Sequence, residues 1–171
     1  DRVPEISGEV QEELARRRIM YGGEVARTFL RPSFLTAGQF RQLEHACNVL
    51  IGAVDTILTS VFGGDIARMG SSLGIAPEEL ELTVVDPGYP LQVAINRMDA
   101  FVSGDRLTFL EFNCDSPAGI AYGDELAEVI GGTPFFRDFA ARHRVSCPSG
   151  RDALLAAFRR IYRDWGGRDP L

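Results

Sequence analysis

An apolar stripe in the first half of the chain is the strongest constraint on its fold. Its members recur at steps of three and four residues, which places them on one face of an α-helix. A capping-box pattern at Thr36 and Gln39 precedes the stripe, and Gly63 follows it. The sequence therefore predicts one long helix, which we expect to lie on the core of its own domain; a coiled-coil partner face is the alternative. The stripe consists of Phe40, Leu43, Cys47, Leu50, Val54, Ile57 and Val61.

Helix and strand patterns around this segment predict a mixed α/β or α+β fold, in which several helices flank a sheet that contains a β-hairpin. The strands are expected at residues 82–85, 91–102 and 107–113. The other helices are expected at residues 9–20, 65–80, 120–130, 134–142 and after Ser149, which caps the last of them. We expect a single amino-terminal domain that is mainly helical over 1–80, contains the sheet and hairpin over 81–119, and is helical over 120–171, ending in a linker.

The composition excludes several classes of function. Apolar residues make up 45% of the chain and charged residues 25%, which is typical of a folded globular domain. The net charge of −6 argues against nucleic acid or an anionic membrane surface as a partner. All 18 basic residues are arginine, so this chain contains no P-loop lysine and no Schiff-base lysine.

Cysteine usage and hydropathy favour a cytoplasmic location. The three cysteines are widely spaced and form no C-x-x-C pair, so neither a disulfide framework nor a zinc site is indicated. The first residues carry no apolar signal region. The apolar stretch at 46–62 is short and is interrupted by Asn48 and Asp55, so we do not expect it to span a membrane.

Polar side chains alternate along the two strands of the expected hairpin. Arg97 and Asp99 share one face of the first strand, and Glu111 and Asn113 share one face of the second. A three-residue loop at 104–106 sets Asp99 opposite Glu111 and Arg97 opposite Asn113, whereas a two-residue loop puts the two pairs on opposite faces. We favour the three-residue loop, because the apolar side chains of Ile95, Phe101, Leu107 and Phe109 then frame the charged cluster.

Two carboxylates side by side repel each other unless a cation lies between them. Arg97 supplies part of that positive charge, and a bound Mg²⁺, which prefers oxygen ligands, can supply the rest. After the strand, Ser116 and the turn that ends at Gly119 lead into a helix, and the N–H groups of that turn suit a carboxylate or a phosphate. A solvated strand edge and an ordinary turn are the plain alternatives for these two features.

Residues 96–119 resemble a known family at these positions. An Arg-x-Asp strand, an apolar-Glu-apolar-Asn strand and a Ser/Gly-rich turn are similar to the eukaryotic-type glutathione synthetases. They are closer still to bacterial glutathionylspermidine-synthetase-like proteins, which have a circularly permuted ATP-grasp fold. Elsewhere in the chain the resemblance lies in the order of elements.

The resemblance implies that the chain is the amino-terminal, substrate- and metal-holding portion of an ATP-dependent carboxylate–amine ligase. Glu111 and Asn113 would hold Mg²⁺ against the ATP phosphates, and Arg97, oriented by Asp99, would contact the substrate. Ser116 and Gly119 would bind the carboxylate end of that substrate. The family's ATP-binding lysines and glycine-rich lid would lie in a downstream region. The implied partners are small-molecule or peptide carboxylates and amines.

Two other hypotheses remain. The chain can be a non-catalytic module that binds another protein through the apolar stripe. Alternatively, Cys114 can be a catalytic thiol, for which neither His45 nor His143 is an obvious base.

Overall fold

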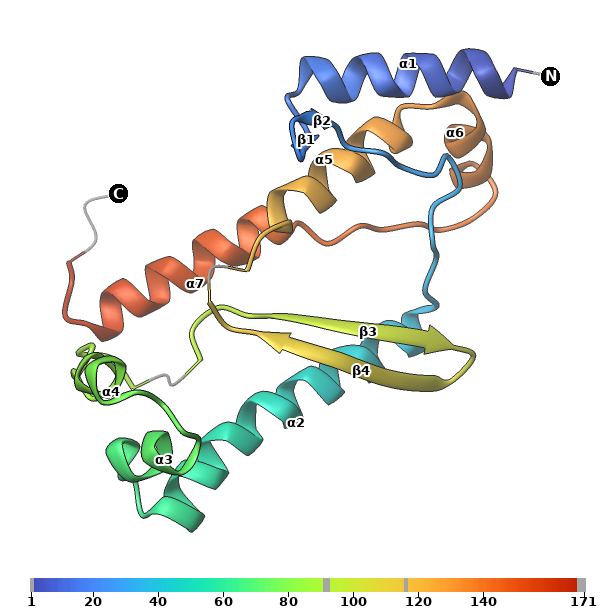
Figure 1. Cartoon of the computed structure of the whole chain (residues 1–171). Helices are drawn as coiled ribbons and strands as arrows, with labels where there is room; N and C mark the ends of the chain where they lie inside the picture. The colour runs from blue at the N-terminus through green and yellow to red at the C-terminus, as the bar shows by residue number, and fades with distance from the viewer. Residues whose placement is uncertain (1, 91–92, 116, 169–171) are drawn as a thin grey trace. The chain divides into compact units, whose positions relative to one another are not determined.

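The structure, a computed structural model, describes residues 2–90, 93–115 and 117–168. Helices and small antiparallel sheets make it an α+β protein, which is one of the two fold classes that the sequence predicts. The domain organisation expected from the sequence stays a prediction. The chain divides into two compact units, each built from segments that are distant in sequence (Figure 1). Unit 1 comprises Asp1–Phe34 and Ala118–Leu155, and unit 2 comprises Leu35–Pro117 and Ala156–Leu171.

Unit 1 contains the main hydrophobic core of the described residues. Its elements are α1 (Val3–Arg16), β1 (Met20–Tyr21), β2 (Glu24–Val25), α5 (Ile120–Gly131), α6 (Pro134–Ala140) and the first residues of α7 (Gly150–Asp164). Ile6, Val10 and Leu14 recur every four residues, so α1 turns one continuous stripe inward. This stripe packs with Val129 and Ile130 of α5. The two helices therefore bury one shared face.

The short hairpin β1–β2 was not predicted from the sequence. Its turn consists of Gly22 and Gly23, whose φ angles of 62° and 86° lie in the left-handed region that glycine adopts without strain. A Gly-Gly turn is a hairpin signal, but strands of two residues are too short for a visible alternation pattern.

Asp124 of α5 forms hydrogen bonds with the first residues of α7 within unit 1. Its carboxylate accepts hydrogen bonds from the backbone N–H groups of Gly150 and Arg151, both at 2.9 Å, and from Ser149 Oγ at 3.2 Å. Arg151 also pairs with Glu125 at 2.6 Å and with Glu128. The carboxylate thus occupies the positive end of a helix whose first N–H groups would otherwise lack partners. Ser149 itself caps the helix by accepting from Asp152 N at 3.1 Å, as predicted.

Arg17 extends this charged network to α1. Its guanidinium lies 2.6 Å from Glu125, 2.7 Å from Glu128 and 2.7 Å from Glu13. Hydrogen bonds from Arg16 and Arg17 lower the pKa of Glu13 to about 2. Backbone hydrogen bonds lower the pKa of Asp124, and hydrogen bonds from Arg17 lower that of Glu128. Glu13, Asp124 and Glu128 are therefore better stabilised as anions in the folded protein than in the unfolded chain.

Unit 2 is built on α2 (Ala37–Phe62), the long helix that the stripe predicts. The capping box is present, because Thr36 Oγ1 accepts from Gln39 N at 3.1 Å and Gln39 Oε1 accepts from Thr36 N at 2.9 Å. The helix ends at Gly63, whose φ of 67° terminates it in the left-handed conformation. The other elements are α3 (Ile66–Ser72), α4 (Pro77–Thr83), β3 (Arg97–Ser103), β4 (Arg106–Asn113) and the remainder of α7.

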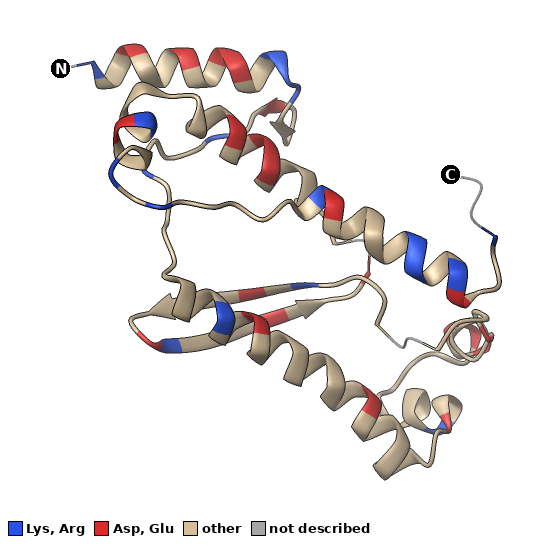
Figure 2. Ribbon diagram, turned by 180° about the vertical axis from the view of Figure 1, so that it is seen from behind, with Lys and Arg blue, Asp and Glu red and all other residues tan. Residues whose placement is uncertain are grey.

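The apolar stripe of α2 is less buried than predicted. Leu58, which is not a member of the stripe, is the buried apolar residue of the helix, whereas Leu50, Ile57 and Val61 are exposed. Figure 2 shows how few charges the helix carries along most of its length. By length and composition alone, α2 would be able to cross a membrane, a test that core helices of soluble proteins also pass. The expectations of a core position and of no membrane segment are therefore not confirmed.

Two strand boundaries differ from the prediction. Residues 82–85 form no strand, because Pro77 starts α4 and the helix continues to Thr83. The first strand of the large hairpin begins at Arg97, not at residue 91. Residues 91 and 92 lie outside the described residues, and residues 94 and 95 form a bend.

We predict that unit 1 loses stability in acid. Because the pKa of Glu13 falls from 4.5 to about 2 on folding, its contribution is fully present above pH 4.5 and is lost as the pH falls towards 2. Asp124 and Glu128, whose pKa values are also lowered, contribute with the same sign. Thermal unfolding followed by circular dichroism should show Tm decreasing across this interval.

Asp124→Asn should lower Tm at neutral pH by several degrees and flatten the acid dependence, because the amide places an N–H group against the N–H donors of Gly150 and Arg151. Asp138→Asn, which alters an exposed acid of α6, is the matched control. Equal Tm values for the two variants would contradict this role of Asp124.

We also predict that Gly88→Ala destabilises unit 2 by roughly 1–3 kcal/mol. Gly88 has a φ of 77°, and a Cβ at this position would lie 2.7 Å from Cδ1 of Trp165. Gly64→Ala is the control, since its φ of 82° imposes the same backbone strain while its Cβ would meet nothing within 4 Å. Urea unfolding should show a larger decrease in the free energy of unfolding for Gly88→Ala than for Gly64→Ala. Equal decreases would show that the contact between residue 88 and Trp165 is not tight.

Candidate functional site

The pairing of β3 with β4 brings four predicted site residues onto one face of the hairpin. Arg97 lies opposite Asn113, and Asp99 lies opposite Glu111, as predicted. Directly opposed residues of an antiparallel pair project from the same face, at Cβ separations of about 4.5–5.5 Å. The side-chain arrangement on which the functional hypothesis depends is therefore present.

The predicted loop that was meant to produce this pairing is wrong. Ser103 pairs with Arg106, so the turn is the two-residue type, and Gly104 takes a φ of 59° at its first position. Such a turn alone would set Asp99 opposite Leu110. The register shifts between Asp99 and Ala100, where Leu110 forms a β-bulge, and this extra residue restores Asp99 to Glu111.

The predicted apolar frame is also partly wrong, for the same reason. Leu107 and Phe109 pair with Val102 and Ala100, so they lie on the face opposite to Phe101. Ile95 precedes the strand. The polar face is consequently more open than predicted, with side-chain exposures of 39% for Asp99 and 56% for Glu111.

A network of short polar contacts joins the four side chains. Arg97 Nε donates to Asp99 Oδ1 at 2.8 Å, and a terminal nitrogen of the same guanidinium lies 3.5 Å from Glu111 Oε1. Asn113 Nδ2 donates to Glu111 Oε1 at 2.9 Å. The hydrogen bond and charge of Asp99, followed by the charge of Glu111, raise the pKa of Arg97 above its ordinary value. Two carboxylates facing one guanidinium leave the face with a net charge of −1.

Helix α2 holds the tip of the hairpin. Gln39 Nε2 donates to the carbonyl of Gly104 at 2.8 Å, and Gln42 Nε2 donates to the carbonyl of Asp105 at 3.2 Å. The glutamines are three residues apart and therefore lie on one side of the helix. They satisfy both carbonyls of the turn. Sequence reasoning missed this function of Gln39 and Gln42, because no local pattern connects a helix surface to a turn more than 60 residues away.

The donor set on this face is compatible with Mg²⁺. Asp99 and Glu111 offer carboxylate oxygens and Asn113 offers an amide oxygen, which are the hard ligands that Mg²⁺ prefers. The Asn113 amide, which turns its nitrogen towards Glu111, would rotate to present its oxygen. Among the described residues no cluster of three or more His, Cys, Asp or Glu side chains could hold a metal ion. A magnesium ion here would depend on phosphate and water for its remaining ligands.

The predicted roles of Ser116 and Gly119 stay predictions. Ser116 lies outside the described residues. Gly119 is the N-cap of α5, in unit 1, with a φ of 101° that only glycine adopts readily. Desolvation raises the pKa of the Cys114 thiol, which favours its unreactive form. Among the described residues, no histidine forms a hydrogen bond with Cys114, so the geometry does not support a catalytic thiol.

We predict that Arg97→Gln makes unit 2 dependent on an added divalent cation. Without the guanidinium, Asp99 and Glu111 oppose each other with uncompensated charge. Tm at neutral pH should fall by a few degrees and should recover on addition of Mg²⁺ more than in the wild type. Arg106→Gln, at the turn end of the same hairpin, is the control. An equal Mg²⁺ response of both variants would show that the face does not hold a cation.

The comparisons with known proteins do not identify a family: no protein-family model, no curated protein and no solved structure matches this chain.

Proposed function

We propose that this chain is the substrate- and magnesium-binding portion of an ATP-dependent carboxylate–amine ligase with a circularly permuted ATP-grasp fold. One observation carries the proposal: Arg97, Asp99, Glu111 and Asn113 meet on one face of the β3–β4 hairpin. An acid, an amide and a guanidinium within hydrogen-bond reach suit a magnesium–phosphate complex next to a carboxylate substrate. The family resemblance of residues 96–119 supports the same assignment.

Each side chain has a distinct task in this proposal. Glu111 and Asn113 hold the metal ion, which when bound neutralises phosphate charge and orients phosphoryl transfer. Arg97 binds the substrate carboxylate, because a guanidinium matches a carboxylate with two parallel hydrogen bonds. Asp99 orients Arg97 through the 2.8 Å contact. Gln39 and Gln42 fix the hairpin tip and thereby the register of the face.

The proposed reaction converts a substrate carboxylate and ATP into an acyl phosphate and ADP. A substrate amine then attacks the acyl carbon and expels phosphate, which forms the amide. No covalent protein nucleophile is required. The substrates are small-molecule or peptide carboxylates and amines.

The test is metal-dependent nucleotide binding. We expect the chain to bind Mn²⁺, used as a spectroscopic substitute for Mg²⁺, more tightly when ATP is present, since phosphate oxygens complete the coordination shell. Glu111→Gln should weaken this binding by roughly tenfold or more, because it removes a charged ligand. Water-proton relaxation or electron paramagnetic resonance measures the bound Mn²⁺.

Glu81→Gln provides the matched control, because Glu81 is an exposed acid on α4 of the same unit. Its Mn²⁺ affinity should equal that of the wild type. If Glu111→Gln and Asn113→Ala bind Mn²⁺ as tightly as the control variant, the proposed metal role is contradicted. The hairpin face would then be a solvated strand edge.

The second candidate function is a non-catalytic interaction module. The observation in its favour is α2, a helix of 26 residues on which Val49, Ile57 and Val61 are 48–59% exposed. Association through α2 would make the molecular mass depend on concentration, and Val61→Glu would abolish that dependence. Multi-angle light scattering measures the mass.

A further inference from the structure

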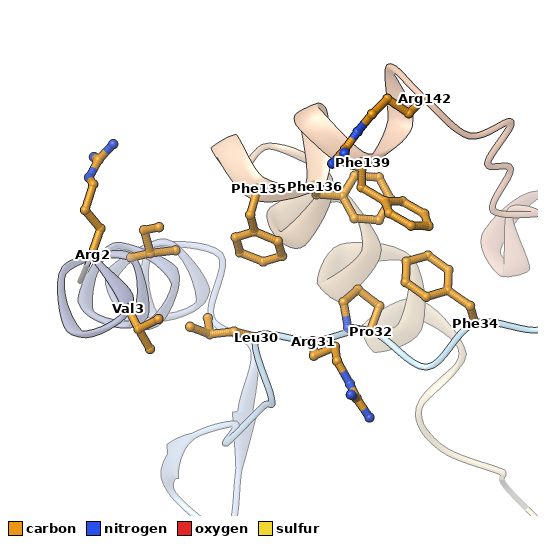
Figure 3. Close-up of a pocket in the computed structure, with 11 residues that line it drawn as sticks. Arg2, Val3, Leu30, Arg31, Pro32, Phe34, Phe135, Phe136, Phe139 and Arg142 are labelled. Carbon is orange, nitrogen blue, oxygen red and sulfur yellow. The ribbon is translucent and has the colours of Figure 1, made fainter.

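A cavity in unit 1 is lined by none of the hairpin residues and has its own chemistry. It measures about 510 Å³, within the range of small-molecule binding pockets. Three segments enclose it: the start of α1, residues 30–34, and α6 with the residues that follow it (Figure 3). Because its lining includes the buried core residue Ile6, the cavity borders the packed core of the unit.

The walls are almost entirely apolar. Figure 3 shows Phe135, Phe136 and Phe139 on one side, with Leu30, Pro32 and Phe34 facing them. The rings of Phe34 and Phe139 stack with centroids 4.7 Å apart, so the aromatic wall is held by its own contacts. Phe135 and Phe136 also pack against the hydrophobic core. Such a wall suits an acyl or aryl body and gives no hydrogen bonds to a polar one.

The edge of the cavity is positively charged. Arg2, Arg31 and Arg142 are its charged lining residues, and none of the described aspartates or glutamates lines it. In a chain with 24 acidic and 18 basic residues, an arginine-only edge is not what average composition would produce. Arg2 pairs with Glu5 at 3.1 Å, and Arg142 Nε donates to the backbone carbonyl of Asp138 at 3.1 Å. Among the described residues, no carboxylate neutralises Arg31 or Arg142.

We propose that this cavity binds a small amphipathic carboxylate, with its apolar body against the phenylalanines and its anionic head at Arg142. The apolar wall contributes affinity through burial, and Arg142 selects an anion over a neutral molecule of the same shape. The site is independent of the hairpin face and of the ligase proposal. It would serve as an effector or carrier site for a compound with an acyl or aryl chain.

The experiment compares decanoate with decan-1-ol, which has the same chain and no charge. Isothermal titration calorimetry on the 171-residue protein should show decanoate binding roughly tenfold more tightly, the difference expected for one charge-assisted hydrogen bond. Arg142→Gln should weaken the binding of decanoate without affecting the binding of decan-1-ol. Arg144→Gln, which changes an exposed arginine outside the cavity lining, is the control and should leave both affinities unchanged.

A second variant tests the cavity itself. Val3→Phe enlarges an exposed lining residue at the start of α1 without altering the core, so it should weaken both probes. Amide chemical shifts should change at Leu30, Phe135 and Phe136 when decanoate is added. Three outcomes would overturn the proposal: no decanoate binding at millimolar concentration, a decanoate affinity that Arg142→Gln leaves unchanged, or chemical-shift changes confined to α2.

Discussion

The register of β3 against β4 is the constraint on which the functional part of this structure depends. Strand side chains alternate between faces, so a change of one residue in the pairing would move Glu111 and Asn113 away from Arg97 and Asp99. The register is fixed at two places: Gly104 forms the tight turn, and Leu110 forms the bulge. The hydrogen bonds from Gln39 and Gln42 then hold the turn against α2. The acidic, amide and guanidinium side chains lie on one face because the turn and the bulge together produce this register.

Local signals made much of the fold predictable from the sequence. The capping box at Thr36, the left-handed glycine after α2 and the cap at Ser149 each depend on neighbouring residues, and each is present in the structure. The presence of the large hairpin was also predictable, because two strand-like segments flank a Gly-Asp turn. The long α2 helix was predicted with its correct ends.

The features that could not be predicted are those that depend on distant residues. A bulge at Leu110 cannot be distinguished from a longer loop, since both solutions give the same pairing of Asp99 with Glu111. The carboxylate of Asp124 satisfies a helix that begins 26 residues later, and the charged network from Glu13 to Arg151 joins segments more than 100 residues apart. No pattern within a short window encodes these contacts. The exposure of α2 was unpredictable for a related reason: periodicity identifies an apolar face and does not identify what covers it.

The bulge at Leu110 also has a consequence for how this hairpin can vary in length. From Asp99 to the end of β3 at Ser103 the chain takes four steps, whereas from Arg106 to Glu111 it takes five, and the extra step is the bulge. Removing Leu110, whose side chain is 60% exposed, would equalise the two arms and leave every functional pair in place. Removing one residue elsewhere between Arg106 and Glu111 would have the same outcome only if the bulge then disappeared. A one-residue change in the length of β4 would therefore move Glu111 and Asn113 to the other face of the hairpin unless it occurs at the bulge. At the bulge, a length difference of one residue between related chains leaves the polar face unchanged.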